Sequence, residues 1–173
     1  MKIIKKTRIS GFTLIELLVV IAIIAILAAV VIIGLQNAIE RSKTSRAKAE
    51  IKEIYKAMIF LANDTGNWPG YKTPNQKQCP PNDVPSNEIC SDGCSFELED
   101  CKAGLVCTPG DYPNWTGPYI KEMPKDPWGN EYFFDTDYTI NGNCEVVVGS
   151  YGPNGQRLNN YDSDNIVYIV PAN

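Results

Sequence analysis

The sequence predicts an α+β protein in which a long N-terminal helix, half of it spanning a membrane, packs on a small antiparallel sheet. Three observations lead to this prediction. Residues 17–35 are apolar and uncharged, residues 47–61 carry apolar side chains at spacings of four and three, and the last third holds short β-branched segments between turn residues. These patterns are typical of a membrane span, an amphipathic helix and strands.

The apolar run is long enough to cross a bilayer. Its 19 residues would form a helix of about 28 Å, against about 30 Å for a hydrocarbon core. Glu16 lies at the edge of the run, where a charge is costly unless an opposite charge lies nearby. A secretory signal peptide has a shorter apolar region, and a plain signal anchor does not need this glutamate. A basic leader precedes the run, with Lys2, Lys5, Lys6 and Arg8.

The block Gly11-Phe12-Thr13-Leu14-Ile15-Glu16 behind this leader resembles the N-terminus of type IV pilins and type II secretion pseudopilins. The resemblance implies a pilin-type fold with a class III leader peptide at residues 1–11 and a transmembrane and polymerisation helix at 12–35. It implies that a prepilin peptidase cuts between Gly11 and Phe12, and that the new N-terminus is methylated. It also implies that Glu16 pairs with the N-terminal amine of a neighbouring subunit during filament assembly.

The apolar spacing beyond the membrane span predicts an amphipathic continuation of the same helix over residues 36–66. One face of this segment carries Ala47, Ile51, Ile54, Met58 and Leu61. Such a stripe packs on a soluble core. We therefore expect one helix from about Thr13 to about Asn63, with Gly66 as a left-handed stop.

The composition excludes several classes of function. The 173 residues carry a formal charge of −4 and no histidine. Removing the four basic leader residues leaves 12 basic against 20 acidic side chains, a side-chain net of −8. Nucleic-acid binding needs a basic surface, so no nucleic-acid partner is expected. Without histidine the chain also lacks the commonest general base and transition-metal ligand.

Six cysteines follow the membrane helix. An even number in an exported segment predicts three disulfides, although the spacing leaves their pairing open. A zinc site is the rival interpretation, but the chain has no Cys-x-x-Cys pair; free buried thiols would be expected in a reducing compartment. The basic leader favours a cytoplasmic N-terminus, hence a single-pass protein of the inner (cytoplasmic) membrane with its C-terminal domain in the periplasm or at the cell surface. The cysteines are Cys79, Cys90, Cys94, Cys101, Cys107 and Cys144.

The soluble part divides into a Cys/Pro-rich loop region at residues 67–118 and a C-terminal sheet region at 119–173. The loop region is either a partner-facing surface or a loop held by disulfides. The strands are expected at Glu131–Phe134, Glu145–Val148 and Ile166–Val170. Isolated carboxylates such as Asp135 and Asp137 are expected in solvated turns.

Two further blocks narrow the resemblance. The segments 114–120 and 124–130, followed by Tyr132, resemble the major pseudopilin, the G subunit, of type II secretion systems. We expect a structural role for the second segment. Its two prolines fix the backbone, Gly129 permits a tight turn, and Trp128 can fill the seam between sheet and helix.

The resemblance also implies a calcium site, since major pseudopilins bind calcium in the loop that corresponds to residues 150–155 and 162–166. Calcium takes six to eight oxygen ligands, and the loop is rich in them. The matching positions are Asn154, Asp162, Asp164, Asn165 and the carbonyl of Tyr151. Asn154 and Asn165 are neutral where the family commonly has aspartates, which predicts weaker binding. An ordinary Asn/Asp-rich surface turn is the alternative.

The sequence therefore predicts a structural subunit that polymerises into a type II secretion pseudopilus, and no enzyme. The resemblance implies as partners further copies of itself, other pseudopilins, a prepilin peptidase and an inner-membrane assembly platform with its ATPase. A surface type IV pilus subunit, serving adhesion, motility or DNA uptake, is the alternative. A membrane-anchored enzyme is a remote one, because no nucleophile–base motif is present.

Overall fold

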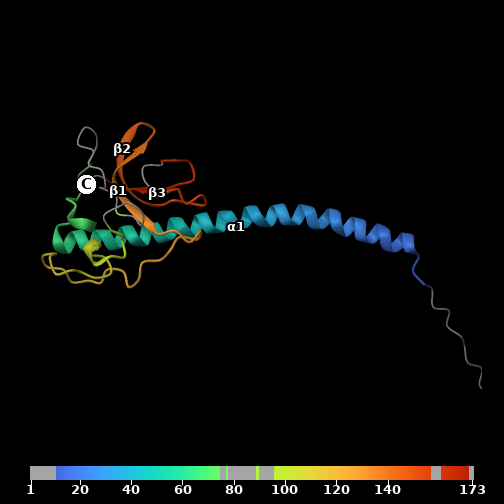
Figure 1. The fold of residues 1–173 in the computed structure, drawn as a ribbon, viewed down its shortest axis with the longest axis horizontal. Coiled ribbons are helices and arrows are strands. Elements are labelled where there is room, and N and C mark those ends of the chain that lie inside the picture. The colour runs from blue at the N-terminus through green and yellow to red at the C-terminus, as the bar shows by residue number, and fades with distance from the viewer. Residues whose placement is uncertain (1–10, 75–76, 78–88, 90–95, 157–160, 172–173) are drawn as a thin grey trace, which may run out of the picture. The chain divides into compact units, whose positions relative to one another are not determined.

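The computed structural model describes residues 11–74, 77, 89, 96–156 and 161–171, without the side chains of 30–33. The chain divides into two units, Met1–Arg41 and Ser42–Asn173. Helix α1 begins in the first unit and ends in the second, and all strands belong to the second (Figure 1). The elements are α1 (Leu14–Thr65), η1 (Pro69–Tyr71), η2 (Cys101–Ala103), β1 (Tyr132–Ile140), β2 (Asn143–Ser150) and β3 (Ile166–Ile169).

Helix α1 ends close to the predicted position. Gly66 has φ +74°, and its N–H donates to the carbonyl of Ala62 at 2.8 Å. The hydroxyl of Thr65 donates to the carbonyl of Leu61 at 2.7 Å. A left-handed residue that closes the last turn is the usual helix stop, and glycine adopts it without steric cost. The predicted helix and its stop at Gly66 are confirmed.

The part of α1 in the second unit buries the predicted apolar face. Ala47, Ile51, Ile54, Met58 and Leu61 are at most 1% exposed. All of them except Ala47 belong to one core with residues of the sheet and of the loop region, among them Trp68, whose ring packs edge-to-face on Phe134 at 5.7 Å. Trp68 thus fills the position expected for Trp128. Trp128 itself is half-buried, and Lys43 Nζ lies 5.9 Å from the centre of its ring.

Polar contacts also join α1 to the sheet. Tyr132, at the start of β1, is 1% exposed and donates its hydroxyl proton to Glu50 at 2.5 Å. Glu50 also pairs with Arg46 at 2.8 Å. Burial, followed by the neighbouring Glu50, raises the pKa of Tyr132 well above its usual range. The phenol therefore stays protonated and serves as a donor to the carboxylate at all moderate pH values.

The sheet is antiparallel with strand order β1-β2-β3. Asn141 and Gly142 connect β1 and β2, and both have positive φ, 51° and 78°. An Asn-Gly pair with two positive φ angles is the favoured two-residue hairpin turn, because its twist matches that of the strands. The α+β class and the three strands are confirmed, although β1 and β2 extend further toward this turn than predicted.

The expectation that Asp135 and Asp137 lie in solvated turns is wrong. Both belong to β1 and are 0% and 6% exposed. The pairing of β1 with β2 shifts between Asp135 and Tyr138, and there the Asp137 N–H donates to Asp135 Oδ1 at 2.8 Å. A bulge of this kind turns side chains away from the regular alternation. Burial lowers the pKa of the nearby Lys72, and the charges of Asp137 and Asp135 offset part of this lowering.

Each face of the sheet carries its own apolar cluster. Tyr132 and Phe134 join the core on the helix side, whereas Phe133 joins a second cluster with Tyr138, Val147 and Tyr151. Alternating residues of a strand point to opposite faces, which explains this division. The Phe133 ring stacks on Tyr151 with ring centres 4.5 Å apart. The second cluster therefore fixes the start of the loop that follows β2.

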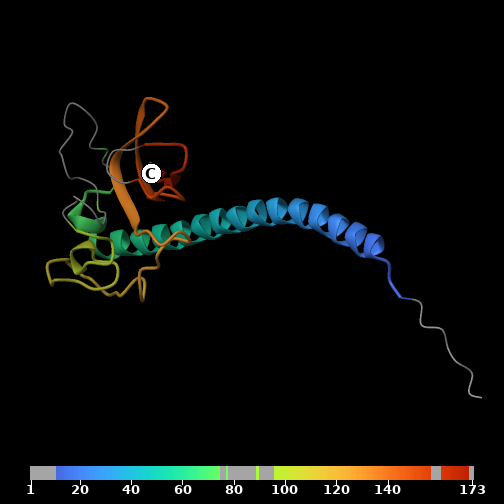
Figure 2. The ribbon, with the colours of Figure 1, turned by 45° about the vertical axis from the view of Figure 1, so that its right-hand side comes forward.

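The yellow segment of the loop region lies across α1 from the sheet in both ribbon views (Figures 1 and 2), whereas Ile89 of the same region pairs with Phe134 of β1. The Tyr112 hydroxyl accepts from Gly70 N at 2.9 Å and donates to the carbonyl of Lys102 at 2.9 Å. Burial raises the pKa of Tyr112 to about 12, so this hydroxyl keeps its proton at neutral pH. A single phenol thus ties η1 to η2.

Candidate functional site

Helix α1 begins with a capping box formed by Thr13 and Glu16. The Glu16 carboxylate accepts from Thr13 N at 2.8 Å and from Thr13 Oγ1 at 2.7 Å. Glu16 N donates to Thr13 Oγ1 at 3.3 Å. Such reciprocal bonds satisfy N–H groups that have no partner in the first helical turn. The Thr-x-x-Glu spacing signals this box in the sequence, and the interpretation of Glu16 as an assembly residue alone overlooks it.

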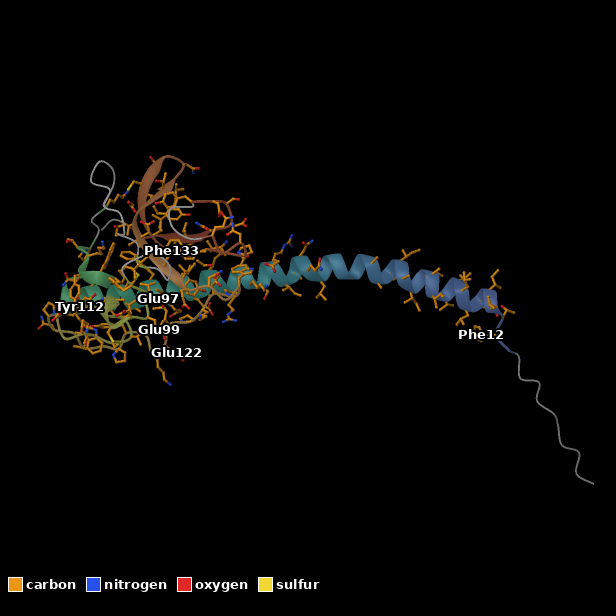
Figure 3. All side chains as sticks on the ribbon, viewed as in Figure 1. Phe12, Glu97, Glu99, Tyr112, Glu122 and Phe133 are labelled. Atoms are coloured by element: carbon orange, nitrogen blue, oxygen red, sulfur yellow. A yellow bond between two sulfur atoms is a disulfide. The ribbon has the colours of Figure 1, made fainter. Side chains whose placement is uncertain are left out.

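The predicted processing site lies immediately before this box. Gly11 and Phe12 are exposed, and the Phe12 side chain, labelled in Figure 3 at the start of α1, is 83% exposed. A Cβ added at Gly11 would meet no atom within 4 Å. The peptide bond between the two residues is therefore open to an approaching protein. Cleavage there stays a prediction.

The first part of α1 presents a continuous apolar surface. Every residue from 11 to 29 is exposed, and the helix is long and apolar enough to cross a membrane. An exposed apolar surface of this size marks a site of contact with lipid or with another protein. It includes Leu14, Ile15, Leu17, Leu18, Ile21, Ile24 and Leu27.

The second predicted site, which we call the calcium-type loop, comprises residues 150–155 and 162–166. Asn154 Nδ2 donates to Asp162 Oδ2 at 2.7 Å, and Asp164 N donates to Asp162 Oδ1 at 2.9 Å. Asp162 thus links two of the other predicted ligand positions. Asn165 Nδ2 instead donates to the Tyr138 hydroxyl at 2.9 Å, toward the second apolar cluster. The side chain of Tyr151 packs in that cluster, so only its carbonyl would be a ligand.

A buried carboxylate that the sequence interpretation overlooks holds the base of this loop. Asp126 is 4% exposed and accepts from Ser150 Oγ at 2.6 Å and from Asn130 N at 2.8 Å. Asn130 Nδ2 donates to the carbonyl of Gly152 at 3.1 Å, and Gly152 N donates to Ser150 Oγ at 3.0 Å. The segment 124–130 therefore positions both polar groups of the Gly152 backbone. The hydrogen bond between Ser150 and Asp126 joins residues 24 positions apart in the sequence, so no local sequence pattern reveals it.

The donor chemistry of the loop fits a calcium ion. Asn154, Asp162 and Asp164 supply amide and carboxylate oxygens, which are the ligands that calcium prefers. A Cβ at Gly152 would lie 2.0 Å from the carbonyl oxygen of Asp164, so the two loop segments approach as closely as only glycine permits. Among the described residues, no three His, Cys, Asp or Glu side chains are grouped as a metal cluster. A bound ion would therefore need amide, backbone or water oxygens beside the two carboxylates.

Disulfides are present in the second unit, Ser42–Asn173, which we call the soluble unit. Cys101 and Cys107 are bonded to each other and enclose η2, and Cys144 in β2 is also disulfide-bonded. The predictions for Cys79, Cys90 and Cys94 lie outside the described residues. The Cys101–Cys107 bridge and the N-cap formed by Asp100, whose side chain accepts from Lys102 N, together fix the short turn at η2.

The long capped helix with an apolar first part, packed by its second part on a three-stranded sheet, defines a pilin-like protein. Residues 6–32 match the family model of the prokaryotic N-terminal methylation motif, and residues 97–168 match that of type II secretion system protein G. The chain is 30% identical to type II secretion system core protein G of Pseudomonas aeruginosa, over 90% of this chain and 94% of that protein. It therefore belongs to the type II secretion system protein G family, as the sequence resemblance predicts.

Further relatives carry the same name. The core protein G of Vibrio cholerae is 30% identical over 88% of this chain and 86% of that protein. That of Aeromonas hydrophila is 33% identical over 74% of this chain and 73% of that protein. The chain is thus a pseudopilin of type II secretion, and the alternative of a surface pilus subunit is not favoured.

Proposed function

We propose that this pseudopilin polymerises through α1 into the pseudopilus that helps to drive protein export. The exposed apolar surface of residues 14–27 is the observation that carries this proposal. In the membrane this surface faces lipid. In a filament outside the membrane it is stable only against the helices of neighbouring subunits. The chain acts as a structural subunit and not as an enzyme.

We propose that assembly follows cleavage between Gly11 and Phe12 by a prepilin peptidase and methylation of the new N-terminal amine. The leader lies on the cytoplasmic side of the inner membrane, where an assembly platform and its ATPase extract the subunits. The soluble unit lies outside the cytoplasm, consistent with its disulfides at Cys101–Cys107 and at Cys144. Partners are further copies of the chain and other pseudopilins.

A deletion strain tests this function. It is scored for its secreted proteins and for filaments that shearing releases from the surface, and is complemented with the intact gene. We expect loss of secreted proteins with surface filaments unchanged. Loss of filaments with normal secretion would instead identify a surface pilus subunit.

We further propose that the calcium-type loop binds calcium through oxygens of Asn154, Asp162 and Asp164, with the carbonyl of Tyr151 and the amide of Asn165 as additional candidates. The oxygen-rich donor set and the close approach at Gly152 support this. Because two of the five positions are asparagines, the site carries less negative charge than an all-aspartate site, and binding is correspondingly weak.

A melting experiment on the full chain in detergent tests calcium binding. The three tryptophans Trp68, Trp115 and Trp128 all belong to the soluble unit, so their fluorescence reports its unfolding. A ligand that binds only the folded state raises Tm, by an amount that grows with its concentration. We expect millimolar calcium to raise Tm and EDTA to reverse the rise, while Asp162→Asn abolishes the response. A wild-type Tm that does not respond to calcium would contradict the proposal.

A further inference from the structure

A direct hydrogen bond between the side chains of Asn154 and Asp162 joins the two segments of the calcium-type loop. Asn154 Nδ2 donates to Asp162 Oδ2 at 2.7 Å. The other polar atoms of both side chains are also engaged. Asn154 Oδ1 accepts from Gln156 N and Asp162 Oδ1 accepts from Asp164 N, each at 2.9 Å. The amide is therefore oriented with its nitrogen toward the carboxylate.

The charge of residue 154 decides whether this contact attracts or repels. An amide N–H donates to a carboxylate, and a hydrogen bond to a charged acceptor is stronger than one between neutral groups. An aspartate in the same place would set two carboxylates against each other, and a cation bound by both would offset this repulsion. The amide N–H of Asn154 thus supplies the partial positive charge that a shared cation would otherwise supply.

Direct hydrogen bonds also fix the base of the loop. Gly152 N donates to Ser150 Oγ, and Asn130 Nδ2 donates to the Gly152 carbonyl. The buried Asp126 accepts from the side chains of Ser150 and Asn130. Together with the Asn154–Asp162 hydrogen bond, these contacts hold the loop both at Gly152 and between its two segments.

From this geometry we infer that Asn154 is a built-in substitute for a bridging cation, so that the loop closes without metal. A calcium ion then competes with Asn154 Nδ2 for Asp162 Oδ2, instead of being required to bring the two segments together. The competition rests on the calcium binding proposed above, whereas closure in the absence of metal does not.

Melting curves of the full chain in detergent, recorded by tryptophan fluorescence in EDTA and in millimolar calcium, test the inference. In EDTA we expect Asn154→Asp and Asn154→Ala to melt about 2–6 °C below wild type, the shift that loss of one such contact produces in a domain of this size. Calcium should raise the Tm of Asn154→Asp more than that of wild type, because the aspartate adds a charged ligand. Asn143→Asp, on the exposed first residue of β2, is the matched control and should melt as wild type in EDTA.

Two results would overturn the inference. One is a Tm of Asn154→Asp in EDTA that equals the wild-type Tm. The other is a wild-type Tm that lies as low in EDTA as that of Asn154→Ala. If calcium stabilises no variant, the calcium proposal fails while the EDTA comparison still decides the role of Asn154. Should Asn154→Asp fail to fold, Asn154→Ala in EDTA gives the same decision.

Discussion

Asp126 is the residue on which the geometry of the calcium-type loop depends most. Its buried carboxylate accepts from Trp128 N and Asn130 N within its own turn and from Ser150 Oγ at the end of β2. A buried carboxylate is stable only when donors surround it in this way. Asp126 therefore defines a local turn and at the same time fixes that turn to a distant strand end.

Asp126→Ala should lower the free energy of unfolding by about 2–4 kcal/mol, because several buried donors lose their charged acceptor together. Urea unfolding of the full chain in detergent, followed by tryptophan fluorescence, measures the loss. Asp111→Ala, which removes an exposed carboxylate, is the control and should change stability by less than about 0.5 kcal/mol. Equal effects of the two substitutions would show that Asp126 is not a structural centre.

The residues around Asp126 show which contacts of this site can be predicted from the sequence. The prolines and Gly129 predict a turn at 124–130, because their backbone preferences are local. The sequence does not predict that Ser150 meets Asp126, since that contact depends on how the sheet places two distant segments. The predicted exposure of Asp135 and Asp137 is wrong for a related reason. Aspartates are usually exposed, but a shift in strand pairing buries these two.

The end of α1 is fixed to the loop region by one carboxylate. Asp64 accepts from the Tyr119 hydroxyl at 2.9 Å and also from the hydroxyl of Thr116. These two hydrogen bonds, that from Thr116 first, lower the pKa of Asp64 below its usual value of 3.8. The segment 114–120 therefore owes its position on α1 in part to a charged acceptor.

This lowered pKa predicts a pH dependence. Because the folded state holds the proton less tightly than the unfolded state, Asp64 contributes stability above its unfolded pKa, and that stability is lost as pH falls through the folded pKa. The loss begins near pH 4 and continues below it. Asp64→Asn should therefore flatten the fall of Tm between about pH 5 and 3. Asp111→Asn is the control, and an identical slope in wild type and Asp64→Asn would refute the prediction.

Helix α1 is also the element that the sequence predicts best. Its apolar run, its amphipathic spacing and Gly66 are local signals, and the helix runs from Leu14 to Thr65 as they indicate. The first two strands are predicted in position but too short, because a hairpin turn and a bulge, which the strand pattern does not show, set the extent of β1 and β2. The third strand is predicted one residue too long. The loop region offers no periodic signal, and its described part is held by specific contacts such as those of Tyr112.

The chain as a whole combines a helix whose first part is apolar and exposed with an acidic soluble unit. Glu16 belongs to the first of these, and the structure gives it a local partner in Thr13. Two explanations of this glutamate therefore compete, a helix cap within one subunit and a charge that pairs with the next. The two can be separated because glutamine also completes a capping box.

Glu16→Gln should keep the cap but remove the charge, and Thr13→Ala should weaken the cap but keep the charge. If the charge sets register, we expect Glu16→Gln and Glu16→Ala both to abolish assembly in the complemented deletion strain, while Thr13→Ala retains most of it. Crosslinking of membranes and of sheared filaments distinguishes polymer from membrane-resident monomer. Glu53→Ala, on the exposed face of α1, is the control.

A filament formed by Glu16→Gln as readily as by wild type would refute the charge role. Loss of assembly in Thr13→Ala with normal assembly of Glu16→Gln would assign the glutamate to the cap alone.

The capping box also bears on how a neighbouring subunit would reach Glu16. Both hydrogen bonds from Thr13 end on Oε2 of the carboxylate. Under the proposed assembly, a neighbour's amine would bind the other oxygen, and the helix cap would stay in place. One carboxylate would then serve both the first turn of its own helix and the register of the added subunit. The cohesion of the fibre would rest on the exposed apolar surface of α1.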